Sequence, residues 1–132
     1  MNDDLVQAAR QAAEAAYAPY SKYLVGAAVR TAFGEIVTGC NVENASYGLA
    51  LCAERNALFA ARAAGLLDPE SAPPQAIAIH APQSPLPRPC GACRQVMAEF
   101  AGDDLPVIID GPDEQFETTL GALLPEAFRF KP

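Results

Sequence analysis

Hydrophobic positions along the first third of the chain follow a helical period and then an extended one. Over residues 5 to about 17, apolar side chains recur every three or four positions, which predicts a helix that Pro19 ends. Alanines fill most of its apolar face, so another element can approach it closely. Residues 23–31 and 35–41 are β-rich and flank a short turn that contains Gly34, which permits positive φ. They predict a β-hairpin.

The rest of the chain alternates between the two patterns. An apolar face from about Leu51 to Ala64, followed by Gly65 as a left-handed cap, predicts a second helix. The other predicted elements are a buried strand at 75–81, a proline-rich irregular loop at 82–89, a helix at about 91–100, strands at 105–110 and 115–117, and a helical turn at 118–124. Strands that alternate with helices predict a three-layer α/β/α fold with a five-stranded mixed sheet.

Length and charge limit the class of protein. The 132 residues suit one domain, over residues 1–132, and are too few for two. The net charge is −7 and the nine basic residues form no cluster, which argues against a nucleic-acid partner. The first residues are acidic where a signal peptide is basic, and no long apolar span follows. We therefore expect a cytoplasmic protein that makes no membrane contact and keeps its four cysteines reduced.

Cysteine spacing suggests a metal site. Cys90 and Cys93 are three residues apart, so on a helix they share a face, and two thiolates there can bind one Zn²⁺ with Zn–S bonds of about 2.3 Å. His80 has no partner at ligand spacing and favours a structural or solvated role. Cys40 is a stronger rival ligand, because a fourth cysteine would close a structural Cys₄ site in a binding module.

Six fragments extend this pattern over almost the whole chain. They are residues 17–21, 25–28, 39–45, 52–55, 89–96 and 123–128, in that order. Together they resemble the small homotetrameric cytidine deaminases. The resemblance implies that Cys52, Cys90 and Cys93 bind one Zn²⁺ per chain and leave a fourth position for water. It also implies that Glu54 carries protons and that Arg55 donates hydrogen bonds to the sulfurs. The ligands are predicted in the first turns of two helices, whose dipoles favour thiolates.

The resemblance implies hydrolytic deamination of cytidine and deoxycytidine to uridine and deoxyuridine plus ammonia, as part of pyrimidine salvage. Water activated at zinc attacks C4 of the cytosine ring, and Glu54 moves protons to N3 and then to ammonia. The substrate contacts implied by the family are Asn41 and Glu43 at the ribose hydroxyl, the main chain near Ala53 at the amino group and N3, Tyr47 of an adjacent chain at the 5′ hydroxyl, Phe128 of a neighbouring subunit stacked on the base, and Tyr23 beside the sugar.

Three alternatives remain beside this interpretation. The polar loop from Asn41 to Tyr47 could be only a loop, if judged by composition. A closed Cys₄ site would be structural, and Glu54 would then have no catalytic role. An aminonucleoside antibiotic of the blasticidin type is a third possibility, but deaminases of that type lack the Asn-x-Glu-Asn found at 41–44. Tyr23 stands where the family usually has Phe, and its hydroxyl needs a partner if it is buried.

Overall fold

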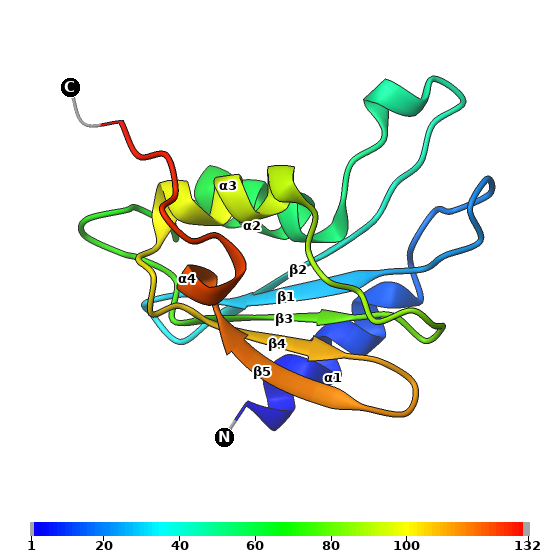
Figure 1. Ribbon diagram of the computed structural model, residues 1–132, viewed down its shortest axis with the longest axis horizontal. Helices are drawn as coiled ribbons and strands as arrows, with labels where there is room; N and C mark the ends of the chain where they lie inside the picture. Colours follow the sequence, from blue (N-terminus) through cyan, green and yellow to red (C-terminus); the bar gives the residue numbers. More distant parts are fainter. Residues whose placement is uncertain (1, 131–132) are drawn as a thin grey trace.

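The computed structural model describes residues 2–130, in which a five-stranded sheet lies between two layers of helices (Figure 1). In chain order the elements are α1 (Asp3–Ala13), β1 (Gly26–Arg30), β2 (Ile36–Cys40), the 3₁₀ helix η1 (Tyr47–Leu49), α2 (Ala53–Ala63), β3 (Ala76–His80), α3 (Gly91–Phe100), β4 (Pro106–Asp110), β5 (Gln115–Thr119) and α4 (Leu120–Leu123). The strand order is β2-β1-β3-β4-β5. The predicted three-layer α/β/α fold with a mixed five-stranded sheet is confirmed.

Strand directions follow from the connections. β1 and β2 form the predicted antiparallel hairpin, and Gly34 has the expected positive φ of 86°. β3 and β4 are the parallel pair, since α3 crosses between them, whereas β3 runs antiparallel to β1 and β5 antiparallel to β4. The carboxyl ends of β3 and β4 therefore lie at one edge of the sheet.

Small residues let the helices approach the sheet closely. One core cluster lies between the sheet and α2, α3 and α4, and a second lies between the sheet and α1. A Cβ added at Gly26 would lie 2.1 Å from the carbonyl oxygen of Ala9 in α1. A Cβ at Gly39 would lie 2.5 Å from the backbone nitrogen of Ala57 in α2. The contact at Gly39 fixes the start of α2, where the candidate site lies.

Several element boundaries differ from the prediction; β1, for example, begins at Gly26 rather than at residue 23. Two of the differences have a clear physical cause. The first helix ends at Ala13, four residues early, because the next amides bond three residues back and Tyr17 donates to the carbonyl of Asn41 instead of continuing the helix. Thr118 and Thr119 were expected in the last helical turn but pair with β4 as part of β5. Thr119 then caps α4 through its side-chain oxygen.

The search for membrane-crossing helices covered the described residues and found none of sufficient length and apolarity.

Candidate active site

Three cysteines converge where α2 and α3 begin. The Sγ atoms of Cys52 and Cys90 are 3.9 Å apart, those of Cys90 and Cys93 are 3.5 Å apart, and all three lie within 4.8 Å of one another. A tetrahedral ion with Zn–S bonds of about 2.3 Å needs sulfurs about 3.8 Å apart. The cluster therefore fits a zinc ion with three protein ligands.

Helix starts position these sulfurs. Cys52 and Cys90 are the N-cap residues of α2 and α3, with extended backbone angles, and Cys93 lies in the first turn of α3. The prediction that Cys52 belongs to the first turn was therefore off by one position. Because both helices direct unpaired N–H groups and the positive ends of their dipoles at the cluster, they offset negative charge on the sulfurs.

Hydrogen bonds polarise the three thiols unequally. A bond from the Cys93 thiol and another from Arg55 lower the pKa of Cys52 to about 5, against the opposing effect of burial. The pKa of Cys93 is raised because Cys93 is the partner that donates to Cys52 and is buried. One negative charge is thus favoured on Cys52, and a dication would allow all three sulfurs to ionise.

Arg55 contacts the cluster, as the family resemblance implied. Its Nη2 donates to Cys52 Sγ at 3.3 Å, and this contact raises the pKa of the guanidinium. The Arg55 Nε is buried without a hydrogen-bond partner within residues 2–130. The side chain is therefore committed to the sulfur side of the site.

Glu54 is the buried carboxyl of the site. Only 5% of the residue is exposed. Burial, with a contribution from Cys52, raises the pKa of Glu54 to about 7, which suits a group that both accepts and donates protons near neutral pH. Ala53 is fully buried and is the first residue of α2, so its N–H is not used by the helix.

Tyr23 is half-buried, and its hydroxyl has a hydrogen-bond partner. Its hydroxyl donates to the carbonyl of Pro85, in the loop that leads to Cys90. Burial and the charge of Glu54 raise the pKa of Tyr23, so the phenol remains neutral near pH 7. No pattern in the sequence predicts this contact with Pro85.

Asn41 and Glu43 organise the loop before α2. The Asn41 side chain accepts from Val25 N at 2.9 Å and donates to Tyr23 O at 2.8 Å. Glu43 accepts from the backbone of Tyr20 and Ser21 and from the Ser21 hydroxyl, which lowers the pKa of its carboxyl. Ser21 was part of a matching fragment but had no predicted role; its hydroxyl is the partner that sequence reasoning missed.

Tyr47 and Phe128, which were predicted to contact substrate bound to other chains, line different surface hollows of this chain. Tyr47 is 76% exposed, packs its ring edge-to-face on Tyr20 at 5.9 Å, and lines a surface hollow with Glu43. Phe128 is 72% exposed and lines a different hollow, beside the end of α3. In Figure 1 the segment around η1 and the C-terminal segment project from opposite sides of the α2–α3 layer. One chain does not bring these two rings together.

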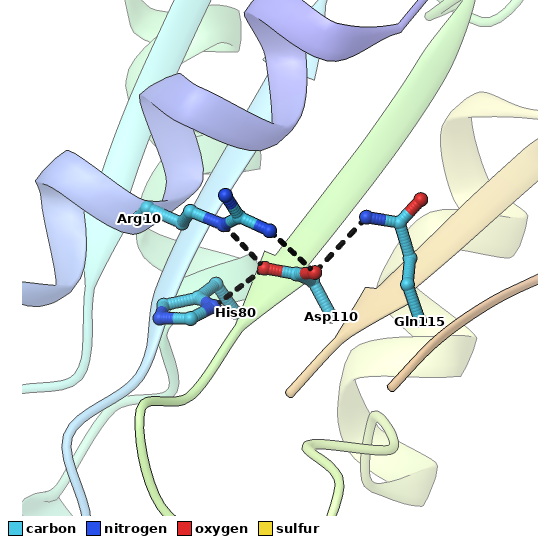
Figure 2. Close-up of polar contacts among 4 residues, drawn as sticks. All are labelled: Arg10, His80, Asp110 and Gln115. Atoms are coloured by element: carbon cyan, nitrogen blue, oxygen red, sulfur yellow. Dashed lines mark hydrogen bonds and ion pairs between the residues drawn. The ribbon is translucent and has the colours of Figure 1, made fainter. Parts of the chain in front are cut away.

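The two rival ligands lie outside the cluster. Within residues 2–130, the cluster able to hold a metal consists of the three cysteines named above and omits Cys40, which is in β2. His80 is buried at the end of β3, where its Nδ1 lies 2.7 Å from Asp110 Oδ2 (Figure 2). Arg10 and Gln115 bond the same carboxylate, so the expected structural role of His80 has a specific partner.

Comparison with known proteins supports the same chemistry. The family model described as the cytidine and deoxycytidylate deaminase zinc-binding region matches residues 1–109. The chain belongs to this family. It is accordingly a hydrolase, and its cofactor is Zn²⁺, which the three-cysteine cluster fits.

Individual relatives cover nearly all of this family member. A protein named cytidine deaminase from Halalkalibacterium halodurans is 48% identical over 126 residues, which is 94% of this chain and 91% of the relative. The crystal structure of cytidine deaminase from Burkholderia pseudomallei has a TM-score of 0.89 and 48% identity, over 97% of this chain and 99% of that one. A blasticidin-S deaminase from Bacillus cereus is 30% identical over 112 residues, 80% of this chain and 76% of the relative.

Proposed function

We propose that this chain deaminates cytidine and deoxycytidine hydrolytically, forming uridine and deoxyuridine plus ammonia, and that the reaction serves pyrimidine salvage. The observation that carries the proposal is a buried carboxyl, Glu54, in the first turn of a helix whose N-cap is one of three clustered thiols. Relatives at 48% identity that are named cytidine deaminases support the substrate, and the blasticidin-S deaminase is more distant at 30%.

Glu54 is the proposed proton carrier. Zn²⁺ held by Cys52, Cys90 and Cys93 supplies a Lewis acid that makes water more acidic. Glu54 takes a proton from that water and delivers it to N3 as the C4–O bond forms. It then moves the second proton to the amino group as the C4–N bond breaks, which releases ammonia. Water and substrate atoms are all accounted for in the product and the ammonia.

The remaining residues hold the substrate in this proposal. Asn41 and Glu43 contact the ribose hydroxyl. The free N–H of Ala53, at the start of α2, donates to the cytosine ring. Asn41 also holds the backbone of residues 23–25, and so places Tyr23 beside the sugar. Tyr47 and Phe128 act on sites of other chains in a homo-oligomer, a tetramer by analogy with the family, because their exposed rings lie apart in one chain.

Loss of cytidine absorbance on adding zinc-loaded protein tests the activity, with blasticidin S as the competing substrate. Glu54→Gln keeps the shape of the carboxyl and removes its proton transfer, so turnover falls about 10²- to 10⁴-fold or more while zinc is retained. Near-normal turnover in this variant would remove Glu54 from the role. Faster deamination of blasticidin S than of cytidine would reverse the substrate assignment.

Zinc content tests the ligands separately. Cys52→Ser, Cys90→Ser and Cys93→Ser each remove one of the clustered sulfurs, and we expect loss of both zinc and activity. Cys40→Ser is the matched control, because Cys40 lies outside the cluster, and this variant keeps about one zinc per chain. Zinc loss from the Cys40 variant would support the structural Cys₄ alternative instead.

A further inference from the structure

The C-terminal segment loses its apolar support just before Phe128. Leu123, Leu124 and Ala127 pack against the larger core cluster. The next two aromatic residues, Phe128 and Phe130, are 72% and 74% exposed. They line a surface hollow together with residues 69–70 and the end of α3, so the segment is not packed flush on the protein beneath it. Burial of side chains therefore does not fix the segment beyond Ala127.

Polar contacts from α3 hold the segment instead. Gln95 Nε2, in α3, donates to the carbonyl of Phe128 at 2.8 Å. Arg129 Nη1 donates to the carbonyls of Ala98 and Ala101 at 2.8 Å each. Ala98 is in the last turn of α3 and Ala101 is its C-cap, so both carbonyls lie where backbone acceptors lack helical partners and the dipole favours a cation. Arg129 Nη2 adds an ion pair to Asp103 at 3.0 Å.

These contacts fix the backbone on both sides of an exposed ring. The carbonyl of Phe128 is bonded, and the side chain of the following residue spans the end of α3, while the Phe128 ring itself points to solvent. Such an arrangement has no benefit for the folding of a single chain, since it leaves a large apolar side chain in water. It suits a ring that is held ready for a surface on another molecule.

We propose that Gln95 and Arg129 are positioning residues that present Phe128 to the nucleoside bound in a neighbouring copy of this chain. The proposal rests on the proposed function, in which Phe128 stacks on the base. It also links two sites through one helix: α3 begins at the zinc-ligand cysteines of its own site and ends at the contacts that hold Phe128 for the next. Because Gln95 and Arg129 already hold the segment that carries Phe128, substrate binding does not have to order it.

Substitution of Arg129 tests this inference, with substitution of Phe128 itself for comparison. Phe128→Ala raises KM about 5- to 150-fold, the change expected for loss of one aromatic–base stack. Arg129→Ala keeps the Phe128 side chain but removes the hydrogen bonds that hold the backbone beside it. We expect KM to rise about 5- to 30-fold, because roughly one residue then has to be ordered when substrate binds. In both variants kcat and zinc content change little. In Arg129→Lys we expect KM to lie between those of the wild type and Arg129→Ala, because an ammonium group still donates to the carbonyls at the end of α3.

Arg62→Ala is the matched control. Arg62 also donates to a main-chain carbonyl beyond a helix end, that of Leu67 at 2.9 Å, but it has no hydrogen bond or ion pair to residues 125–130. We expect its KM to equal that of the wild type. Amide exchange provides a readout that does not depend on substrate: Arg129→Ala speeds exchange over residues 126–130, and Arg62→Ala does not.

Mixed oligomers show in which chain the contacts act. Arg129→Ala chains are refolded with Glu54→Gln chains, and about one site in four then combines an intact Glu54 with an intact segment from a neighbour. Activity at low substrate above the average of the separate variants supports the proposal. Plain averaging overturns it, as does a wild-type KM for Arg129→Ala when Phe128→Ala is defective. A wild-type KM for Phe128→Ala would instead remove the stacking role from the proposed function, and the positioning role with it.

Discussion

Single hydrogen bonds join segments of the active site that are far apart in the sequence. The Tyr23 hydroxyl reaches Pro85, and the next residue, Leu24, donates its N–H to Gln83 Oε1 at 3.1 Å. Both acceptors lie in the loop that leads into Cys90. The Tyr23 hydroxyl therefore attaches the loop that leads to Cys90.

Tyr23→Phe removes this fastening while leaving the ring beside the site. We expect the free energy of unfolding to fall by about 0.5–1.5 kcal/mol, the usual worth of one hydrogen bond, and zinc to be retained. KM should rise a few-fold at most, since the loop stays attached through Gln83. Tyr17→Phe is the control, because the Tyr17 side chain is exposed. Identical unfolding midpoints for the two variants would contradict the role given to the hydroxyl.

Residue-scale chemistry was predictable where it depends on spacing along the chain. The Cys90–Cys93 pair joins residues three apart, and helical geometry brings such residues together. The Arg55 contact with Cys52 was expected from the family resemblance. The Tyr23–Pro85 bond joins residues 62 apart, through a loop with no periodic pattern, and no sequence rule predicts it. The role of Asn41 in holding the backbone of residues 23–25 was hidden for the same reason.

Helices and strands in this protein are placed by close backbone contact as much as by apolar side chains. At Gly39 the start of α2 lies so near β2 that a Cβ would be 2.7 Å from Ala53 O and 2.5 Å from Ala57 N. Since both atoms are backbone, neither can rotate away. The glycine thereby sets the position of Cys52 and Glu54 above the sheet.

Gly39→Ala should therefore displace α2 and disturb the metal site. We expect a loss of about 1–3 kcal/mol in stability from overpacking, seen as a thermal midpoint lower by several degrees, together with weaker zinc retention. Gly48→Ala is the matched control, since a Cβ there meets nothing within 4 Å and the φ of Gly48 is not positive. Equal zinc retention by the two variants during dialysis against a chelator would refute the link between this contact and the site.

Element types were predictable from periodicity, whereas their ends depended on distant partners. The first helix stops at Ala13 because Tyr17 joins Asn41 and pairs with Val42, across 25 residues of sequence. The third helix matched its predicted range of 91–100, because Cys90 lies at its start and the pattern breaks after Phe100. Local signals thus sufficed where no tertiary pairing competed with them.

Asp110 joins four elements at the carboxyl edge of the parallel strands. It accepts from Arg10 of α1, His80 of β3 and Gln115 of β5, and only 1% of the residue is exposed (Figure 2). Burial alone raises the pKa of this carboxyl, but the bonds from Arg10, Gln115 and His80 outweigh it and hold the pKa below its usual value. The folded state therefore favours the ionised form.

Asp110→Asn should cost about 1–3 kcal/mol of stability near neutral pH, because it removes charge-assisted bonds. The sign of the pH dependence follows from the lowered pKa. The contribution is complete above the unfolded pKa of about 3.9 and is lost as pH falls through the folded value. The difference between wild type and variant in denaturant midpoint should be constant from pH 5 to 7 and shrink below about pH 4. A difference that grew in acid would contradict the assignment.

At the scale of the whole molecule, charge limits what the site can accept. The net charge of −7 is carried by a chain with nine basic residues. Near the site Arg55 bonds to Cys52, and Arg94 donates to the carbonyls of Pro89 and Leu123 at 2.6 Å each. Lys22 is exposed, and its charge acts on Glu43, beside the Ser21 turn. A 5′-phosphate would therefore meet an acidic protein in which the two nearby guanidinium groups already have partners and Lys22 lies beside the carboxylate of Glu43.

Cytidine should therefore be preferred to cytidine monophosphate, by about tenfold or more in kcat/KM, because desolvating a phosphate without a bidentate partner costs at least about 1.4 kcal/mol. 5′-O-methylcytidine separates charge from bulk, since it adds atoms at the same position without a charge, and it should lie close to cytidine. Raising the salt concentration should narrow the gap between nucleoside and nucleotide, because screening weakens the repulsion from the protein. Equal efficiency for cytidine and its monophosphate at low salt would show that the 5′ end of the substrate does not face this part of the protein, and the placement of Glu43 and Tyr47 in the substrate site would then have to be abandoned.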